Sequence, residues 1–192
     1  MIRRVRILAA AGLLLLLAAC GGGDGEGEAG SNYVGASGGI TVVKKATDRK
    51  EAPIIKGVGV DGKPLSSDDF AGKTIVVNVW GSWCPPCRKE APALQQVSEE
   101  YADKGVQFLG IDVRDNPAAA KAFERRFGVT YPSIDDYDQK TLLGFSDSLP
   151  AQGIPTTWII DSKGRVAVRI FVDGLTAATL SGLIDDVQKS VP

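Results

Sequence analysis

The chain has 192 residues, of which 44% are hydrophobic and 23% charged, a composition typical of one globular domain with accessory segments. Its formal net charge is −1, so it lacks the basic surplus of a nucleic-acid-binding protein. Histidine is absent, which excludes histidine-based triads, histidine metal sites and a histidine pH switch.

Residues 1–19 have the pattern of an export signal, with three arginines, no acid and an apolar run at 7–19. That run is shorter than the roughly 20 residues of a membrane-spanning helix. It ends in LAAC at 17–20, which resembles the bacterial lipobox. The resemblance implies that Cys20 becomes a lipid-modified first residue and anchors the protein to the outside of the bacterial cell membrane. An uncleaved anchor, an ordinary cleaved signal and the twin-arginine route are the alternatives.

Residues 20–39 are expected to form a flexible tether. Nine of the 19 residues at 21–39 are glycine, and the segment has few apolar groups to bury. Its root-mean-square reach would be roughly 25 Å. We therefore expect one folded domain at 40–192, with its first ordered residue between 40 and 53.

The rest of the chain alternates predicted strands and helices. Asp61-Gly62 is a hairpin dipeptide between two short strand-like pieces. Further strands are expected at 73–82, 106–113, 156–161 and 165–173, and helices from the cysteines to Gly105, at 116–128 and at 176–190. This order predicts an α/β fold with a mixed central sheet.

Cys84 and Cys87, in WGSWCPPCRKEAP, are the only free thiols if Cys20 carries lipid. A structural zinc site needs about four ligands, and the chain offers neither a second cysteine pair nor a histidine. A disulfide that closes so short a loop removes little entropy from the unfolded chain, so a structural staple is also disfavoured. The sequence therefore favours a redox-active pair, in the oxidising or at least unbuffered compartment that export implies.

The position of the pair supports this hypothesis. Cys84 lies where a buried strand ends and a helix begins, so unpaired N–H groups and the helix dipole would stabilise its thiolate. Cys87 lies one turn inside the helix and is expected to be more buried, which suits it to resolve a mixed disulfide. Pro85 and Pro86 are tolerated in the first turn, which they would stiffen, and they should tune the reduction potential.

The stretch VVNVWGSWCPPCRKEAPALQQ, the later GIPTTWIID and the order of elements closely resemble extracytoplasmic thioredoxin-fold proteins of the TlpA/ResA type. The resemblance covers about residues 52–190, and the combination of WCPPC with GIPTT some 70 residues later is highly specific. It implies a thioredoxin-like fold: a mixed central sheet flanked by helices, with an N-terminal β-hairpin and a central insertion at about 116–150.

The resemblance also implies roles for individual residues. Cys84 would be the nucleophile and Cys87 the resolving thiol. Pro155 matches a cis-proline that presents backbone to the bound substrate chain, the alternative being an ordinary trans-proline turn. Glu90 matches a carboxylate that handles protons near the pair, the alternative being an exposed helix glutamate.

Trp83 resembles the ring that flanks the active site, whereas Trp80 is expected in the core. Pro85, Pro86 and Ile154 complete the expected substrate-contacting surface.

Asn78 occupies the place of a buried aspartate in cytoplasmic thioredoxins. An amide cannot accept the proton of the resolving thiol, so that role falls to Glu90 or to water. Arg88 and Lys89 are interpreted as solvated helix charges rather than as groups that lower the pKa of the nucleophile.

The expected function is a membrane-anchored thiol–disulfide oxidoreductase, monomeric and without metal or other cofactor. Family analogues reduce protein disulfides, including those of apocytochromes in cytochrome c maturation, which would require a membrane electron donor. The main alternative is an oxidase that gives disulfides to exported proteins, with a membrane electron acceptor. A peroxiredoxin-like peroxidase is disfavoured because Gly81 stands where that family needs Thr or Ser. The intact cysteine motif disfavours a non-enzymatic lipoprotein.

Overall fold

The computed structural model describes residues 33–35 and 39–191. The export signal, Cys20 and most of the predicted tether therefore lie outside the described residues. Within the described part, no helix is both long and apolar enough to cross a lipid bilayer.

In chain order the strands and helices are β1 (Tyr33–Gly35), β2 (Ile40–Val43), η1 (Ala46–Asp48), β3 (Lys56–Val58), β4 (Pro64–Ser66), η2 (Ser67–Phe70), β5 (Thr74–Trp80), α1 (Pro85–Tyr101), β6 (Val106–Asp112), α2 (Pro117–Phe127), β7 (Ser133–Asp135), α3 (Lys140–Leu143), β8 (Thr156–Ile160), β9 (Val166–Ile170) and α4 (Ala177–Lys189).

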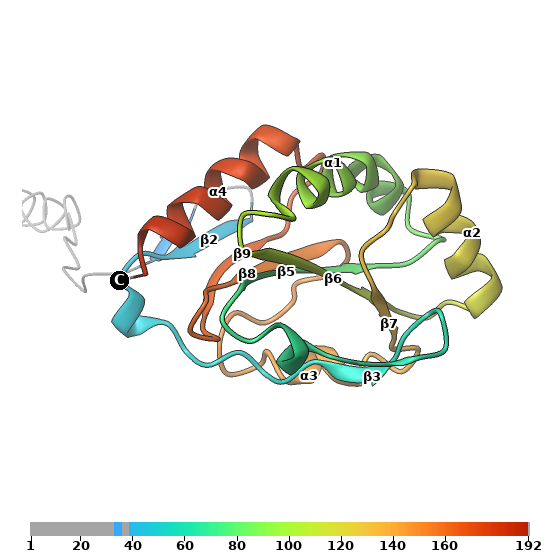
Figure 1. The fold of residues 1–192 in the computed structure, drawn as a ribbon, viewed down its shortest axis with the longest axis horizontal. Coiled ribbons are helices and arrows are strands. Elements are labelled where there is room, and N and C mark those ends of the chain that lie inside the picture. Colours follow the sequence, from blue (N-terminus) through green and yellow to red (C-terminus); the bar gives the residue numbers. More distant parts are fainter. Residues whose placement is uncertain (1–32, 36–38, 192) are drawn as a thin grey trace, which may run out of the picture. The chain divides into compact units, whose positions relative to one another are not determined.

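The described strands form a mixed sheet in the order β1-β2-β9-β8-β5-β6-β7 (Figure 1). β5, β6 and β7 run parallel, whereas the other neighbours in the sheet are antiparallel. The predicted hairpin around Asp61-Gly62 is present as a separate two-stranded sheet of β3 and β4. The α/β class and the mixed sheet flanked by helices are confirmed.

Strand β5 lies inside this sheet, and all seven of its residues are buried. Its sequence, TIVVNVW, is a nearly continuous run of β-branched residues, which is typical of a strand covered on both faces. Val76 packs in a core with residues of α1 and α4, whereas Val77 and Val79 belong to a second core. Figure 1 shows the two faces, with α1 and α4 on one side of the sheet and α3 and β3 on the other.

The three predicted helices correspond to α1, α2 and α4. At the start of α2, the Asn116 side chain accepts a hydrogen bond from the backbone N–H of Ala119 (3.0 Å). The helix ends at Gly128, whose φ of 68° is in the left-handed region that favours glycine.

The structure contains elements that the sequence does not predict. β7 and α3 lie in the insertion at 116–150 and have only three and four residues, too few to display a hydrophobic period. β1 lies inside the predicted tether and pairs with β2, with Tyr33 opposite Val43. β1 therefore adds an edge strand to the central sheet.

A buried ionic cluster joins distant parts of the chain at the end of β8. Arg49 donates from Nη1 to Asp161 Oδ2 (3.0 Å), and the same oxygen lies 3.0 Å from Arg165 Nη2. Arg49 also donates to Ser190 Oγ (2.6 Å). The cluster thus connects the segment before β3 to the sheet and to the end of α4.

Candidate active site

The two cysteines lie at the first turn of α1, which begins shortly after β5 ends. Cys84 is the N-cap of this helix, and its Sγ accepts a hydrogen bond from the backbone N–H of Cys87 (3.3 Å). Pro85 and Pro86 occupy the first two helical positions, where a missing N–H breaks no helical hydrogen bond. The positive end of the helix dipole therefore faces the Cys84 sulfur.

Cys84 and Cys87 are joined by a disulfide in this structure. Their exposed fractions are 2% and 1%, so both cysteines are almost fully buried in this state, Cys87 slightly more than Cys84. Both sulfurs lie in a core cluster with Trp80 and with Ala120 and Phe123 of α2. The helix that follows β6 therefore covers the pair on one side.

Glu90 lies one turn beyond Cys87 on the buried face of α1, with 3% of its surface exposed. It is therefore not an exposed helix glutamate. Burial raises the pKa of Glu90, and a hydrogen bond from Asn78 opposes this rise, so that the pKa is about 7. A carboxyl with such a pKa can accept and release a proton near neutral pH.

Asn78 holds Glu90 through a three-residue hydrogen-bond network. Asn78 Nδ2 donates both to Glu90 Oε1 (2.9 Å) and to Thr157 Oγ1 (3.0 Å). Asn78 and Thr157 are directly paired residues of β5 and β8, so the sheet register brings them together. The sequence predicts that Asn78 and Glu90 lie near the two cysteines. It does not predict Thr157, because only the register between β5 and β8 brings that residue to Asn78.

The two tryptophans near the cysteines have different environments. Trp83 is 44% exposed, donates from Nε1 to the Val113 carbonyl (3.2 Å) and lies 5.0 Å from the Arg114 guanidinium. Trp80 is buried and stacks on Phe123, with 4.4 Å between ring centroids. Trp83 thus forms part of the surface beside Cys84, whereas Trp80 supports that surface from below.

The GIPTT segment lies next to the cysteines. The Ile154–Pro155 peptide bond is cis, and Pro155 is buried. Ile154 is half-buried and packs against the cluster that contains both cysteines. Thr156 Oγ1 donates to the Gly153 carbonyl (2.6 Å), which fixes the turn before β8.

Two side chains fix the loop before Cys84. The backbone N–H of Ser82 donates to Asp115 Oδ2 (2.6 Å), and Arg88 Nε donates to the Ser82 carbonyl (2.7 Å). Lys89 instead lies 3.6 Å from Asp173, with both groups exposed. Arg88 and Lys89 therefore contact other groups, and neither contact involves the Cys84 sulfur.

A second buried carboxyl, Asp112 at the end of β6, is not predicted from the sequence. Burial raises its pKa to about 8, and the nearby charges of Asp115, Asp135 and Glu124 add to the rise. Asp112 Oδ1 has no hydrogen-bond partner among the described residues. From the sequence alone, a buried aspartate at the end of a strand cannot be distinguished from an exposed aspartate at the same position.

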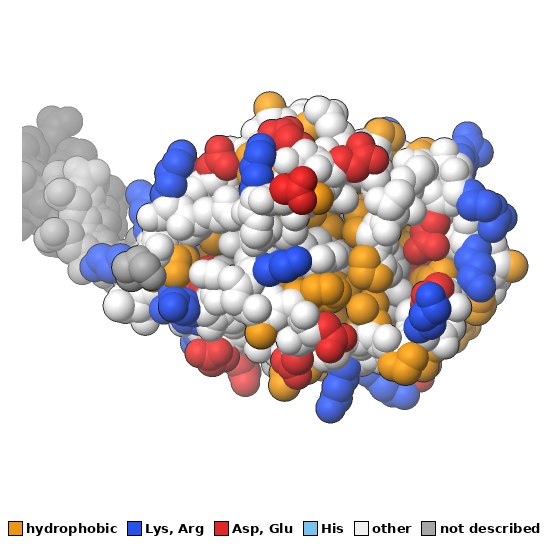
Figure 2. Space-filling view, viewed as in Figure 1, with side chains coloured by type: hydrophobic (Ala, Val, Ile, Leu, Met, Phe, Trp, Pro, Cys, Tyr) orange, Lys and Arg blue, Asp and Glu red, His pale blue; other side chains and the backbone are white. Residues whose placement is uncertain are grey.

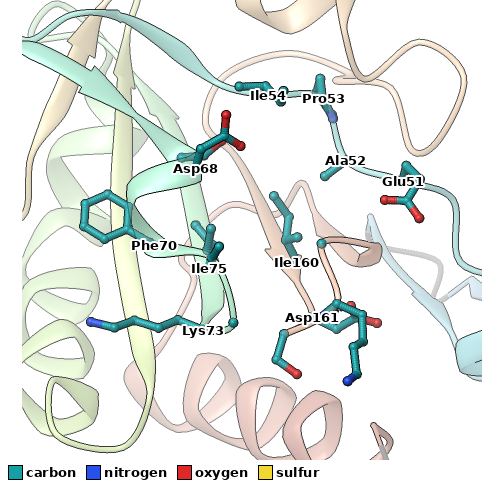
Figure 3. A pocket seen from close by; sticks show the side chains of 16 residues that line it. Glu51, Ala52, Pro53, Ile54, Asp68, Phe70, Lys73, Ile75, Ile160 and Asp161 are labelled. Carbon is teal, nitrogen blue, oxygen red and sulfur yellow. Dashed lines mark hydrogen bonds between the residues drawn. The ribbon is translucent and has the colours of Figure 1, made fainter.

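A pocket of about 330 Å³ lies away from the cysteines (Figure 3). Its walls come from residues 51–54, 67–75 and 160–164, near the start of β5. A seven-residue strand is about 20 Å long, which separates this pocket from the cysteines beyond the other end of β5. None of the predicted site residues lines it.

Comparisons with known proteins agree with this geometry. The model of the family described as Redoxin matches residues 44–183. Thiol-disulfide oxidoreductase ResA of Bacillus thuringiensis (strain Al Hakam) is 34% identical over 121 residues, which cover 63% of this chain and 68% of that protein. The crystal structure of a DsbF homologue from Corynebacterium diphtheriae is 33% identical, with a TM-score of 0.71 over 79% of this chain and 95% of that one. A secreted thiol-disulfide isomerase from Corynebacterium glutamicum is 30% identical, with the same TM-score and coverage.

Proposed function

The chain belongs to the redoxin family and is a thiol–disulfide oxidoreductase, and from this premise we propose that it reduces protein disulfides outside the cytoplasm. The observation that carries the proposal is the placement of a helix-capping cysteine, its disulfide partner and a buried glutamate along one helix. The resemblance implies apocytochromes awaiting haem attachment as one substrate class.

The reaction begins with both cysteines reduced. The Cys84 thiolate, stabilised by the N-terminus of α1, attacks one sulfur of the substrate disulfide and displaces the other as a thiolate. Cys87 then attacks the Cys84 sulfur of the mixed disulfide and releases the second substrate thiol. Two electrons pass to the substrate, and the Cys84–Cys87 disulfide remains on the protein. A membrane-bound dithiol donor would reduce it again.

Glu90 serves the second of these steps. The Cys87 thiol must lose its proton before it attacks, and the buried Glu90 carboxylate is the acceptor next along the helix. Because the pKa of Glu90 is about 7, the carboxyl holds this proton without strongly opposing its later release. Pro155 and Ile154 would contact the substrate chain, with Trp83 and the two motif prolines beside them.

We place this activity on the outer side of the cell membrane, with Cys20 as the lipid-bearing residue and the glycine-rich segment within 20–39 as the tether. The export-signal pattern at 1–19 supports this location. A relative described as secreted adds support. An oxidase of exported proteins would use the same residues in the opposite direction and differ in reduction potential.

Trapping of mixed disulfides tests the assigned roles. Cys87→Ser in the reduced protein should form a stable covalent adduct with a disulfide-bonded protein such as insulin. Cys84→Ser should form no adduct and reduce no insulin. Equal trapping by both variants would contradict the assignment of Cys84 as the nucleophile.

A further inference from the structure

We infer that a groove between α1 and α2 receives an acidic and apolar segment of the substrate, next to the reacting cysteine. The inference rests on the proposed function and extends it to the kind of protein chain that the enzyme prefers. The groove, here called the α1–α2 groove, is lined by Ser82, Arg88, Phe123, Arg126 and Phe127, with two alanines of α2.

The α1–α2 groove adjoins the nucleophile. Ser82 lies two residues before Cys84, and the backbone N–H of Arg88 donates to the Cys84 carbonyl (3.3 Å). A substrate chain that presents its disulfide to Cys84 therefore places its neighbouring residues within reach of this groove. The volume of about 220 Å³ is below the roughly 300 Å³ of small-molecule pockets and suits one or two protein side chains.

Two arginines line the groove. Arg88 uses Nε to hold the Ser82 carbonyl, which leaves its two terminal nitrogens for another acceptor. Arg126 lies with its guanidinium 5.6 Å from the Phe127 ring. Within residues 39–191, neither arginine takes part in a salt bridge. A guanidinium in this setting binds a carboxylate with paired hydrogen bonds.

The surrounding surface carries the same charge. Lys121, Arg125 and Arg126 all project from α2 as exposed residues, and the only acid on that helix is Glu124. Figure 2 shows basic side chains gathered at the edge of the molecule where Figure 1 places α2. The whole chain has a net charge of −1, so this concentration of cations is local to the flank of the active site. It favours an acidic partner chain.

The floor of the groove is apolar. Phe123 and Phe127 lie in contact, with ring centroids 4.7 Å apart, and Phe127 is only half-buried. Aromatic residues and arginine are both enriched at the cores of protein interfaces, and a guanidinium there can pair with a carboxylate. We therefore assign to the groove a substrate segment that pairs a glutamate or aspartate with a leucine-like residue near its cysteine.

Three disulfide-linked peptide dimers test this assignment. They share one sequence with a single cysteine and differ only in having Glu-Leu, Gln-Leu or Lys-Leu beside it. The pre-reduced protein converts each dimer to two thiol peptides and becomes the Cys84–Cys87 disulfide. Tryptophan fluorescence gives the second-order rate constant. We expect the Glu-Leu dimer to react about fivefold faster than the Gln-Leu dimer at low salt, the ratio one partly exposed ion pair supplies.

Arg125 provides the matched control. It neighbours Arg126 in the last turn of α2 but lines a different hollow, with Lys121 and Gly128. Arg126→Gln should therefore abolish most of the preference for Glu-Leu, whereas Arg125→Gln should preserve it. Equal losses in both variants, or no preference in the native protein, would overturn the inference and leave the proposed function intact. Failure to reduce any of the three peptides would overturn the proposed function itself.

Discussion

The Glu90 carboxyl experiences two opposing effects at the scale of single residues. Burial disfavours its charge, while the Asn78 amide donates a hydrogen bond that favours it. Thr157 Oγ1 accepts a second hydrogen bond from the Asn78 amide and so orients that amide toward Glu90. The pKa of about 7 therefore depends on a contact between two strands as well as on the helix that carries Glu90.

Glu90→Gln should slow the resolving step at pH 7 by about 100-fold, because the proton of Cys87 loses its acceptor. The first attack by Cys84 should change little, so the mixed disulfide accumulates in rapid-quench experiments. The loss of rate in the resolving step should be smaller above about pH 8.5, where a free thiol ionises unaided. Glu100→Gln, on the exposed side of the same helix, is the control. A pH-independent loss in both steps would point to a structural role for Glu90.

The stability of the oxidised protein should depend on the same group. The pKa of Glu90 is about 7 in the folded state and 4.5 ordinarily, so the folded state retains a proton that the unfolded state has lost. The free energy of unfolding should therefore fall as pH rises from about 4.5 to about 7, by roughly 3 kcal/mol from this group.

Urea unfolding across this pH range, compared with Glu90→Gln, isolates that contribution. The variant should lack it, while the change due to Asp112, whose pKa is raised in the same direction, remains in both proteins. If the free energy of unfolding varied with pH in the same way for the native protein and Glu90→Gln, Glu90 would be ionised in the folded state at neutral pH, which would contradict the prediction.

The sequence predicts the residues of this site that belong to a contiguous motif, namely the two cysteines and Glu90. It does not predict Thr157 or Asp112, because their environments arise from strand register and from burial between elements. The packing of α2 against both cysteines likewise has no signature near the motif.

At the scale of elements, α2 supports the active site through its contact with Trp80. Phe123 stacks on the Trp80 ring, and both belong to the cluster around the disulfide. Asp115, just before α2, accepts the hydrogen bond of the Ser82 N–H in the loop that leads to Cys84. The helix after β6 therefore fixes both the core beneath the cysteines and the loop before them.

Phe123→Ala should lower the free energy of unfolding by about 3–5 kcal/mol, because it opens a cavity beneath Trp80. Phe127→Ala, which removes the same ring from a half-buried position, should cost less. Urea unfolding of the oxidised proteins measures both values. Similar small losses in the two variants would mean that α2 does not depend on the Trp80–Phe123 stack.

Long and periodic elements are predictable here, as β5, α1, α2 and α4 illustrate. β1, β7 and α3 are not, because each is too short to carry a pattern and forms through its neighbours. β1 pairs with β2, a partner that composition alone does not reveal.

At the scale of the whole molecule, the ionic cluster of Arg49, Asp161 and Arg165 lies at the opposite end of β8 from Pro155. Burial alone would raise the pKa of Asp161, but hydrogen bonds from Arg49 and Arg165 outweigh it and hold the pKa below its ordinary value. The cluster stabilises the fold where the chain before β3 and the last helix meet the sheet.

Asp161→Asn should lower the free energy of unfolding by about 3 kcal/mol at pH 7, because it leaves the buried Arg49 without its counter-ion. The difference in free energy of unfolding between Asp161→Asn and the native protein should become smaller as pH falls below about 4, where the Asp161 carboxylate of the unfolded chain is protonated. Disulfide exchange at 25 °C should be unchanged. Asp103→Asn, at an exposed position, is the control; equal stability of the two variants would contradict a stabilising cluster.

The reduction potential of the Cys84–Cys87 pair tests the central claim most directly. Tryptophan fluorescence in defined redox buffers measures it, because Trp80 and Trp83 flank the pair. A reductant of protein disulfides should have a potential near or below thioredoxin's roughly −270 mV. A potential near roughly −120 mV would contradict the account and identify the protein as a donor of disulfides.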